Sequence, residues 1–165
     1  MTKAFIIDSV RNTDSAQVIN LILPIQQIEN NVPVKLEDQP DLLDIEGVYQ
    51  ASGGGFWAAR HDGEIIGTIA LIAIDNHGGT IRKMFVKKEF RGKEYAIAQQ
   101  LLEKLIDYSR SVGITDLYLG TFHTLKAAIR FYERNGFEQV AKKDLPPSFP
   151  VMQVDDVFCH LDLTR

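Results

Sequence analysis

The residues best suited to chemistry lie in one loop, Arg91-Gly92-Lys93, and in the residues that follow it. A run of β-type residues at 81–86 ends just before this loop, and an amphipathic helical pattern begins just after it. The free N–H groups of a helix's first turn and the positive end of the helix dipole both favour an anion there. A basic loop that contains glycine, between a strand and a helix, therefore predicts a site for a diphosphate.

Positive charges gather around this loop, although the chain as a whole carries a net charge of −4. Such a run is often only a solvated face, but its place between a strand and a helix favours a local anion site. The net charge itself indicates no general attraction to nucleic acid or to an anionic membrane. The basic residues in and around the loop are Arg82, Lys83, Lys87, Lys88, Arg91 and Lys93.

The composition is that of an ordinary globular protein, with 45% hydrophobic and 24% charged residues. A chain of 165 residues is long enough for one domain with its own core, so we expect a single domain over residues 1–165. Its one cysteine, Cys159, excludes an internal disulfide and fits a reducing compartment. The sequence shows no leader-like pattern and no apolar run of membrane-spanning length. We expect a cytoplasmic protein.

Hydrophobic periodicity predicts the order strand, helices, three strands, helix, strand, helix and two strands. This order is typical of a mixed α/β or α+β domain. Pro24 lies inside the first helical pattern and predicts a kink or break, and Asp62-Gly63 predicts a tight hairpin turn. Cys159 alternates with apolar neighbours and is expected in the core. The expected strands are residues 4–7, 56–60, 64–74, 80–86, 116–121, 137–141 and 157–163, and the expected helices are residues 13–28, 41–49, 95–111 and 125–134.

Two motifs, taken with this order of elements, resemble the GNAT superfamily of acetyl-CoA-dependent N-acetyltransferases. Met84-Phe85-Val86, followed by Arg91-Gly92 and Ala96-Ile97-Ala98, is similar to the superfamily's acyl-CoA signature. Residues 128–137, which read Ala-Ile-Arg-Phe-Tyr-Glu-Arg-Asn-Gly-Phe, are similar to its helix ending. The resemblance implies a central, mixed, mostly antiparallel twisted sheet of about six to seven strands with about four helices, splayed between the fourth and fifth strands.

A narrower resemblance is to one bacterial subgroup of this superfamily, whose members occur alone or fused behind a MarR-type regulator. No winged-helix pattern occurs in these 165 residues, so we expect the acetyltransferase domain alone. The segments that carry the resemblance are Gln39-Pro40-Asp41-Leu42-Leu43-Asp44-Ile45, Gly54-Gly55-Phe56-Trp57, Ile66-Gly67-Thr68-Ile69-Ala70-Leu71, Tyr118-Leu119-Gly120-Thr121 and Phe149-Pro150-Val151-Met152.

The resemblance implies that acetyl-CoA is the co-substrate and that backbone groups hold most of it. The pyrophosphate would lie on N–H groups of residues 91–98, and the pantetheine amides would pair with the open edge of residues 84–86. A backbone N–H at Val86 or its neighbour would stabilise the oxyanion on the thioester carbonyl. The residues implied in binding are Met84, Phe85, Val86, Arg91, Gly92, Lys93, Glu94, Tyr95, Ala96, Ile97, Ala98 and Phe131.

Tyr132 matches the superfamily's usual general acid, which protonates the leaving thiolate. An alkylamine has a pKa of about 10.4, so freeing it of its proton at pH 7 costs about 4–5 kcal/mol and needs an acceptor such as a carboxylate, a histidine or a water chain. Glu46, in the acceptor-side helix, and His123, just after the strand that ends at Thr121, are the two candidate bases. No pair of histidines or carboxylates has metal-ligand spacing, so no metal is expected.

The expected reaction transfers an acetyl group to a primary amine of a small molecule or peptide by direct attack in a ternary complex. The amine acceptor is unknown, since residues 31–50, 52–55 and 143–150 share no motif with a known substrate class. The expected protein is a monomer or a homodimer with no nucleic-acid or membrane partner.

The residues leave one alternative function open and disfavour another. Leu125 stands where many members have an asparagine that contacts pantetheine, so a non-catalytic acyl-CoA-binding regulatory module on the same fold is the alternative. An unrelated α/β nucleotide-binding domain is disfavoured, because the chain lacks a Gly-x-Gly-x-x-Gly pattern and has a strand meander before the loop.

Overall fold

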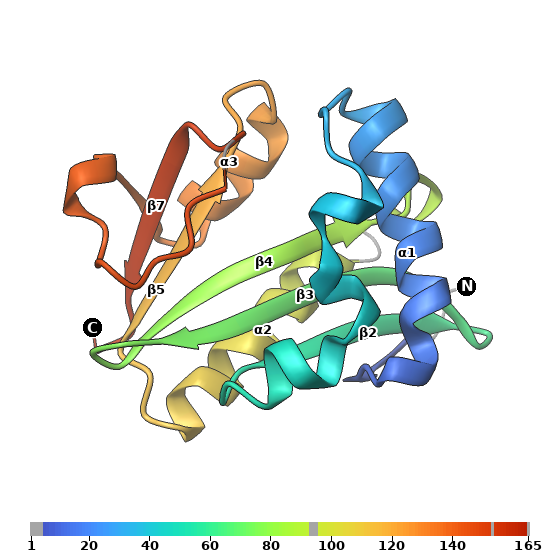
Figure 1. Cartoon of the computed structure of the whole chain (residues 1–165), viewed down its shortest axis with the longest axis horizontal. Coiled ribbons are helices and arrows are strands. Elements are labelled where there is room, and N and C mark those ends of the chain that lie inside the picture. Colours follow the sequence, from blue (N-terminus) through green and yellow to red (C-terminus); the bar gives the residue numbers. More distant parts are fainter. Residues whose placement is uncertain (1–4, 93–95, 153, 165) are drawn as a thin grey trace.

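One seven-stranded sheet organises the computed structural model, which describes residues 5–92, 96–152 and 154–164 (Figure 1). The strands are β1 (Ile6–Ser9), β2 (Gly55–His61), β3 (Glu64–Ile74), β4 (Gly78–Val86), β5 (Asp116–Thr121), β6 (Glu138–Val140) and β7 (Val157–Asp162). Their order across the sheet is β1-β2-β3-β4-β5-β7-β6. Only β4 and β5 are parallel, while the other neighbours are antiparallel. The predicted mixed, mostly antiparallel sheet is confirmed.

Three α-helices flank the sheet: α1 (Ser15–Pro24), α2 (Ile97–Ser111) and α3 (Lys126–Arg134). The chain leaves α1 at Pro24 and continues as a π-helical turn, η2 (Ile25–Glu29). Proline has no N–H to donate to the preceding turn, and the helix changes from α to π directly after Pro24, where a kink or break was predicted, without leaving the helical region. Short turns complete the helical content: η1 (Asn12–Asp14), η3 (Leu36–Asp38), η6 (Lys88–Phe90) and η7 (Lys142–Asp144).

The single helix expected over residues 41–49 is instead two short pieces, η4 (Pro40–Leu43) and η5 (Glu46–Gln50). Asp44 separates them with a non-helical backbone, at φ −145° and ψ 68°. Its Oδ1 accepts the N–H of Gly47 at 3.1 Å and a side-chain N–H of Asn12 at 3.0 Å. A side chain that caps the following turn in this way competes with continuation of the helix. Hydrophobic periodicity does not reveal that competition.

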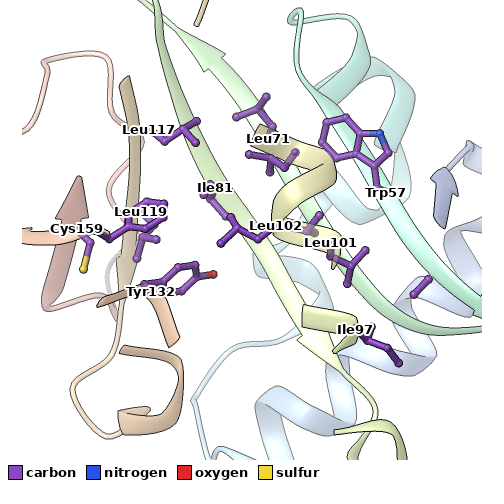
Figure 2. Close-up of a cluster of buried hydrophobic side chains, with 14 of the residues drawn as sticks. Trp57, Leu71, Ile81, Ile97, Leu101, Leu102, Leu117, Leu119, Tyr132 and Cys159 are labelled. Carbon is purple, nitrogen blue, oxygen red and sulfur yellow. The ribbon is translucent and has the colours of Figure 1, made fainter. Parts of the chain in front are cut away.

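Each face of the sheet has its own core. α2 and α3 cover one face, whose core includes Leu71, Ile81, Leu102, Leu117 and Cys159 (Figure 2). α1, η4 and η5 cover the other face, whose core includes Val18, Ile22, Leu42, Tyr49 and Phe56. Burying a large apolar side chain contributes about 1.5–3 kcal/mol, so these two cores hold the helices against the sheet. Cys159 is fully buried, as its alternation with apolar neighbours predicted.

β4 and β5 diverge soon after they meet. Their backbones pair at three positions, of which the last joins Thr80 to Tyr118, and the strands then separate (Figure 1). Gly79 lies at the junction, where a Cβ would come within 2.7 Å of Leu71 Cδ1 and 3.1 Å of Leu117 Cδ2. The missing side chain therefore allows close packing where the two halves of the sheet join. The predicted splay between the fourth and fifth strands is confirmed.

β4 also contains a bulge on its way out of this junction. Ala70 of β3 pairs with Arg82 and Thr68 pairs with Phe85, so two residues of β4 oppose one of β3. Lys83, inside the bulge, has a φ of 56°, and its carbonyl accepts the hydroxyl of Thr68 at 2.7 Å. A bulge bends the strand and redirects the side chains on it.

Candidate active site

A cavity of about 490 Å³ opens where β4 and β5 diverge. Its lining comes from β4, the end of β5, the start of α3, η2 and the loop before β7. These segments are distant in the sequence, and the splay of the sheet brings them to one place (Figure 1). The volume falls within the range of about 300–1,000 Å³ that small-molecule and cofactor sites occupy.

The open edge of β4 forms one wall of the cavity. Met84, Phe85 and Val86 all line it and are half-buried. Beyond Thr80 no described residue of β4 pairs with β5, so the backbone groups on that side have no strand partner there. An extended ligand with amide groups could bind such an edge as an added strand.

The basic loop lies at the far end of this wall. Arg91 lines the cavity, its Nε donates to the carbonyl of Val86 at 2.7 Å, and its guanidinium pairs with Glu29 of η2. The hydrogen bond from Arg91 holds the pKa of Glu29 below its ordinary value. Gly92 has a φ of 153° and Ala96 a φ of 50°. The chain therefore enters α2 through backbone conformations that glycine adopts most readily.

The other residues expected at the pyrophosphate are placed only in part. Lys93, Glu94 and Tyr95 lie outside the described residues. The side chain of Ile97 is buried in the core under α2, so this residue offers a ligand only its first-turn N–H. Ala98 follows it and is half-buried. Pyrophosphate binding at these residues stays a prediction.

Tyr132 of α3 lines the same cavity and is 5% exposed. Its hydroxyl points across towards β4 (Figure 2) and makes no hydrogen bond with a described residue. Burial raises the pKa of the phenol, so the hydroxyl keeps its proton at neutral pH and is available as a donor. Phe131 and Phe137 pack edge-on against the ring, with centroids 5.4 and 5.3 Å away. Phe131 is half-buried in this packing and is not among the residues that line the cavity.

The two candidate bases also lie outside the cavity lining. Glu46 accepts the N–H of Asn12 at 2.8 Å and donates its own N–H to Asn12 Oδ1 at 2.9 Å. These bonds tie η5 to the segment before α1. His123 is exposed, and its Nδ1 lies 2.5 Å from Asp156 Oδ2. The role of either residue as a base stays a prediction.

Lys83 is a charged cavity residue that sequence reasoning assigned only to a basic run. It is buried, with its Nζ 2.5 Å from Gln39 Oε1 and 3.5 Å from Asp41 Oδ2. The same Asp41 oxygen accepts the hydroxyl of Tyr49 at 2.5 Å. Burial lowers the pKa of Lys83 to about 8. Two adjacent charges within an otherwise apolar strand, Arg82 and Lys83, were the signal that could have indicated this.

Asp155 is a second residue that the sequence did not single out. It comes from the loop before β7, lines the cavity and is half-buried. Burial raises the pKa of its carboxyl to about 6. Gly120 of β5 leaves room for it, since a Cβ there would lie 2.6 Å from Asp155 Oδ2. No local pattern marks this aspartate, because only the path of the loop brings it to the cavity.

Thr80 is a third such residue, at the last position where β4 pairs with β5. Its hydroxyl is buried and has no hydrogen-bond partner among the described residues. A buried polar group without a partner is costly, and a ligand or water in the cavity could satisfy it.

Among the residues that the structure describes, no group of three or more histidine, cysteine, aspartate or glutamate side chains could hold a metal ion. No helix among the described residues is long and apolar enough to cross a membrane.

Comparisons with known proteins agree on one family. A model of the acetyltransferase (GNAT) family matches residues 20–137. A solved GNAT-family acetyltransferase from Staphylococcus aureus Mu50 is 39% identical, with a TM-score of 0.94 over 97% of this chain and 99% of that chain. The PaiA N-acetyltransferase from Thermoplasma acidophilum, solved in complex with coenzyme A, is 17% identical, with a TM-score of 0.73 over 96% and 99% of the two chains. This second likeness concerns the fold.

Curated relatives match a shorter stretch. YjgM of Escherichia coli K12, described as an uncharacterized N-acetyltransferase, is 30% identical over 104 residues, which is 61% of this chain and 61% of that protein. The stretches that match two vertebrate relatives span 37% and 49% of the length of those proteins. The similarity to these relatives therefore covers only part of each protein.

Proposed function

Because the chain belongs to the acetyltransferase (GNAT) family, we propose that it transfers an acetyl group from acetyl-CoA to a primary amine of a small molecule or peptide. The observation that carries the proposal is the meeting of Tyr132 with the open edge of β4 in one cavity. The strand edge offers a binding site for the amides of pantetheine, and the buried hydroxyl offers a proton donor beside it.

Acetyl-CoA fits this arrangement in one direction. Its diphosphate would lie at the start of α2, where residues 91–98 supply N–H groups and the positive end of the helix. The pantetheine arm would run from there along residues 84–86, with the thioester carbonyl within reach of a backbone N–H at Val86 or its neighbour. The complex of the Thermoplasma acidophilum relative with coenzyme A supports this choice of donor.

The transfer then needs one attack and two proton movements. The amine nitrogen attacks the thioester carbonyl carbon, a C–N bond forms and the C–S bond breaks. A backbone N–H at Val86 or its neighbour would stabilise the oxyanion, and the hydroxyl of Tyr132 gives its proton to the leaving thiolate. The ammonium nitrogen loses two protons in all, of which one replaces the proton of Tyr132 and the other reaches solvent through a base.

Glu46 and His123 remain the bases proposed from the sequence. Because neither lines the cavity, each would accept the proton through a chain of water molecules. Glu46→Gln and His123→Gln should each lower kcat without changing the affinity for acetyl-CoA if that residue is the base. A variant with unchanged kcat would remove its residue from the mechanism.

The cellular location, oligomeric state and partners of the protein are part of the same proposal. We place the chain in a reducing cytoplasm, because its one cysteine is buried and cannot form an internal disulfide, and we propose a monomer or homodimer from a bacterium. The resemblance to the subgroup found alone or behind MarR-type regulators points the same way. Neither nucleic acid nor a membrane is proposed as a partner.

An acceptor screen that follows the release of CoA thiol tests the function. The panel should contain polyamines, amino acids, aminoglycosides and N-terminal peptides, and thiol release that depends on the added amine supports an enzyme. Tight binding of acetyl-CoA without release across the panel would instead favour the non-catalytic acyl-CoA-binding module, for which Leu125 in the cavity wall leaves room. Absence of acetyl-CoA binding would contradict both functions.

A further inference from the structure

Arg82 and Lys83 are neighbours in β4, and yet both side chains line the cavity. Successive residues of a regular strand point to opposite faces of the sheet. The bulge breaks that alternation, because Lys83 has a φ of 56° and leaves the ladder with β3 locally interrupted. The fold therefore places two cations where a regular strand would place one.

Among the described residues, only one of the two cations, Lys83, has oxygen atoms as side-chain partners. Lys83 contacts Gln39 and lies within ion-pair distance of Asp41. Arg82 is half-buried, makes no ion pair with any described residue, and its one side-chain hydrogen bond goes from Nη2 to the sulfur of Met152 at 3.3 Å. A guanidinium carries five N–H donors in a planar fork that matches a carboxylate. Most of these donors have no partner among the described residues and could bind a ligand.

Asp155 supplies the opposite charge on the same cavity. Its side chain accepts no hydrogen bond from a described residue, and a Cβ on Gly120 would lie 2.6 Å from its Oδ2. The charges that act on it are Arg82 and Lys83 from β4 and Asp156 from its own loop. Arg82 lowers the pKa of Asp155 against the effect of burial, yet the two side chains form no ion pair. An anion and a cation thus line the same cavity, and the charge of Arg82 acts on Asp155 although the two form no ion pair.

Their position along β4 separates them from the proposed donor site. The pantetheine wall runs over residues 84–86, whereas Arg82 lies on the other side of the bulge, towards Thr80 and the junction of β4 with β5. Asp155 lies over Gly120 at the end of β5. Both charges are therefore beyond the expected thioester, on the side from which an acceptor would approach it.

We infer that the acceptor is an amine that also carries a carboxylate, such as a free amino acid, with the carboxylate bound by Arg82 and the ammonium group facing Asp155. This inference rests on the proposed acetyl transfer. A zwitterion of this kind satisfies both unpaired side chains at once, whereas a polyamine would leave Arg82 without a partner and set like charges beside it. Asp155 can also accept the proton that the ammonium loses before attack, so it is a third candidate base.

The first experiment compares acceptors on the unmodified protein. Free L-amino acids are tested against their carboxamides and against plain alkylamines, with CoA thiol release as the readout. We expect kcat/KM for at least one amino acid to exceed that of its carboxamide by about 100-fold or more, since a site built to bind a polar group rejects analogues that lack it. Equal or better use of the carboxamides or alkylamines would overturn this inference and leave the proposed acetyl transfer standing. No release with any amine would overturn both.

A second experiment tests whether Arg82 is the residue that binds the carboxylate of the acceptor. Arg82→Met should raise KM for the preferred amino acid and reduce its advantage over the carboxamide to less than about tenfold. Arg110→Met is the matched control, because Arg110 is exposed on α2 and does not line this cavity. Unchanged affinity for acetyl-CoA would show that Arg82→Met is folded. A variant that binds acetyl-CoA and keeps the full preference would overturn the role of Arg82.

Asp155→Asn separates binding of the ammonium from a structural role. The variant should raise KM for the acceptor, leave the affinity for acetyl-CoA unchanged, and remove the inflection near pH 6 from the profile of kcat/KM. The inflection is expected in the unmodified protein because Asp155 must be ionised to face an ammonium. Asp144→Asn, in the exposed turn η7, is the control. An unchanged pH profile in Asp155→Asn would overturn the role of this carboxylate.

Discussion

Burial in the same cavity shifts the pKa values of Tyr132 and Lys83 in opposite directions. Moving a charged group out of water is costly, so burial favours the neutral form of both. For Tyr132 this raises the pKa, and the phenol remains a proton donor at neutral pH. For Lys83 it lowers the pKa to about 8, although the nearby Asp41 acts in the opposite direction. The same physical cause therefore keeps the phenol of Tyr132 protonated and lowers the pKa of the Lys83 ammonium in the same cavity.

Tyr132→Phe tests the first of these effects. We expect kcat to fall about 100- to 10,000-fold, the range that general acid catalysis supplies. The affinity for acetyl-CoA should not change, because the ring and its packing against Phe131 and Phe137 are kept. Steady-state kinetics and calorimetric titration with acetyl-CoA measure the two quantities. Full turnover in the variant would show that another group protonates the thiolate.

Lys83→Met tests the second effect through the pH dependence of stability. Lys83 has a pKa of about 8 in the folded protein, against 10.5 for an ordinary lysine. Between these values the unfolded chain binds more protons, so the free energy of unfolding gains up to about 1.4 kcal/mol per pH unit from this group as pH rises. Urea unfolding should therefore show the unmodified protein gaining stability relative to Lys83→Met over that interval. The same experiment on exposed Lys142→Met should show no such trend, and a constant difference for Lys83→Met would contradict the shift.

At the scale of elements, two residues with left-handed backbone shape the ends of the donor site. Lys83 forms the bulge in β4, and Ala96, at φ 50° and ψ 33°, is the residue from which α2 begins. Between them lie the strand edge and the loop that are proposed to hold acetyl-CoA. A left-handed conformation is strained for any residue with a Cβ, so both ends of this segment are held in place by their surroundings.

Ala96→Gly should relieve one of these strains. The left-handed conformation costs a non-glycine residue about 1–2 kcal/mol, and the greater freedom of glycine in the unfolded chain offsets about 0.5–1 kcal/mol of the gain. We expect the free energy of unfolding to rise by about 0.5–1 kcal/mol, measured by urea denaturation. Ala98→Gly, at the second residue of α2, is the matched control and should destabilise the protein. Destabilisation by both changes would show that Ala96 is not strained.

Local patterns predicted the elements well and the charged part of the site poorly. The turn at Asp62-Gly63 follows from residue types alone, and both residues have positive φ, at 51° and 80°. Tyr132 was placed by its motif on a helix that reaches the cavity. The sequence did not place Lys83 at the cavity, because a bulge depends on how β4 pairs with β3 rather than on the residues of β4. It did not place Asp155 there either, because the route of the loop before β7 decides which residues Asp155 contacts.

On the scale of the whole molecule, the sheet consists of two parts joined at a narrow seam. β1 to β4 form one part and β5 to β7 the other, and only three backbone positions pair across the junction (Figure 1). The core under α2 and α3 also crosses it, through Ile81 on one side and Leu119 on the other (Figure 2). A ligand in the cavity would contact both parts and add a further connection between them.

Hydrogen exchange with and without acetyl-CoA tests this connection. A ligand at 100 times its dissociation constant stabilises the folded state by about 2.7 kcal/mol, and the slowing of exchange should be greatest where the ligand pairs with backbone amides. We therefore expect new protection at residues 84–86 and at the first turn of α2, together with smaller protection around Tyr132 across the splay. The pair β1–β2 lies away from the cavity and serves as the internal control. Protection confined to that pair, with none at residues 84–86, would contradict binding of the donor along the open edge of β4.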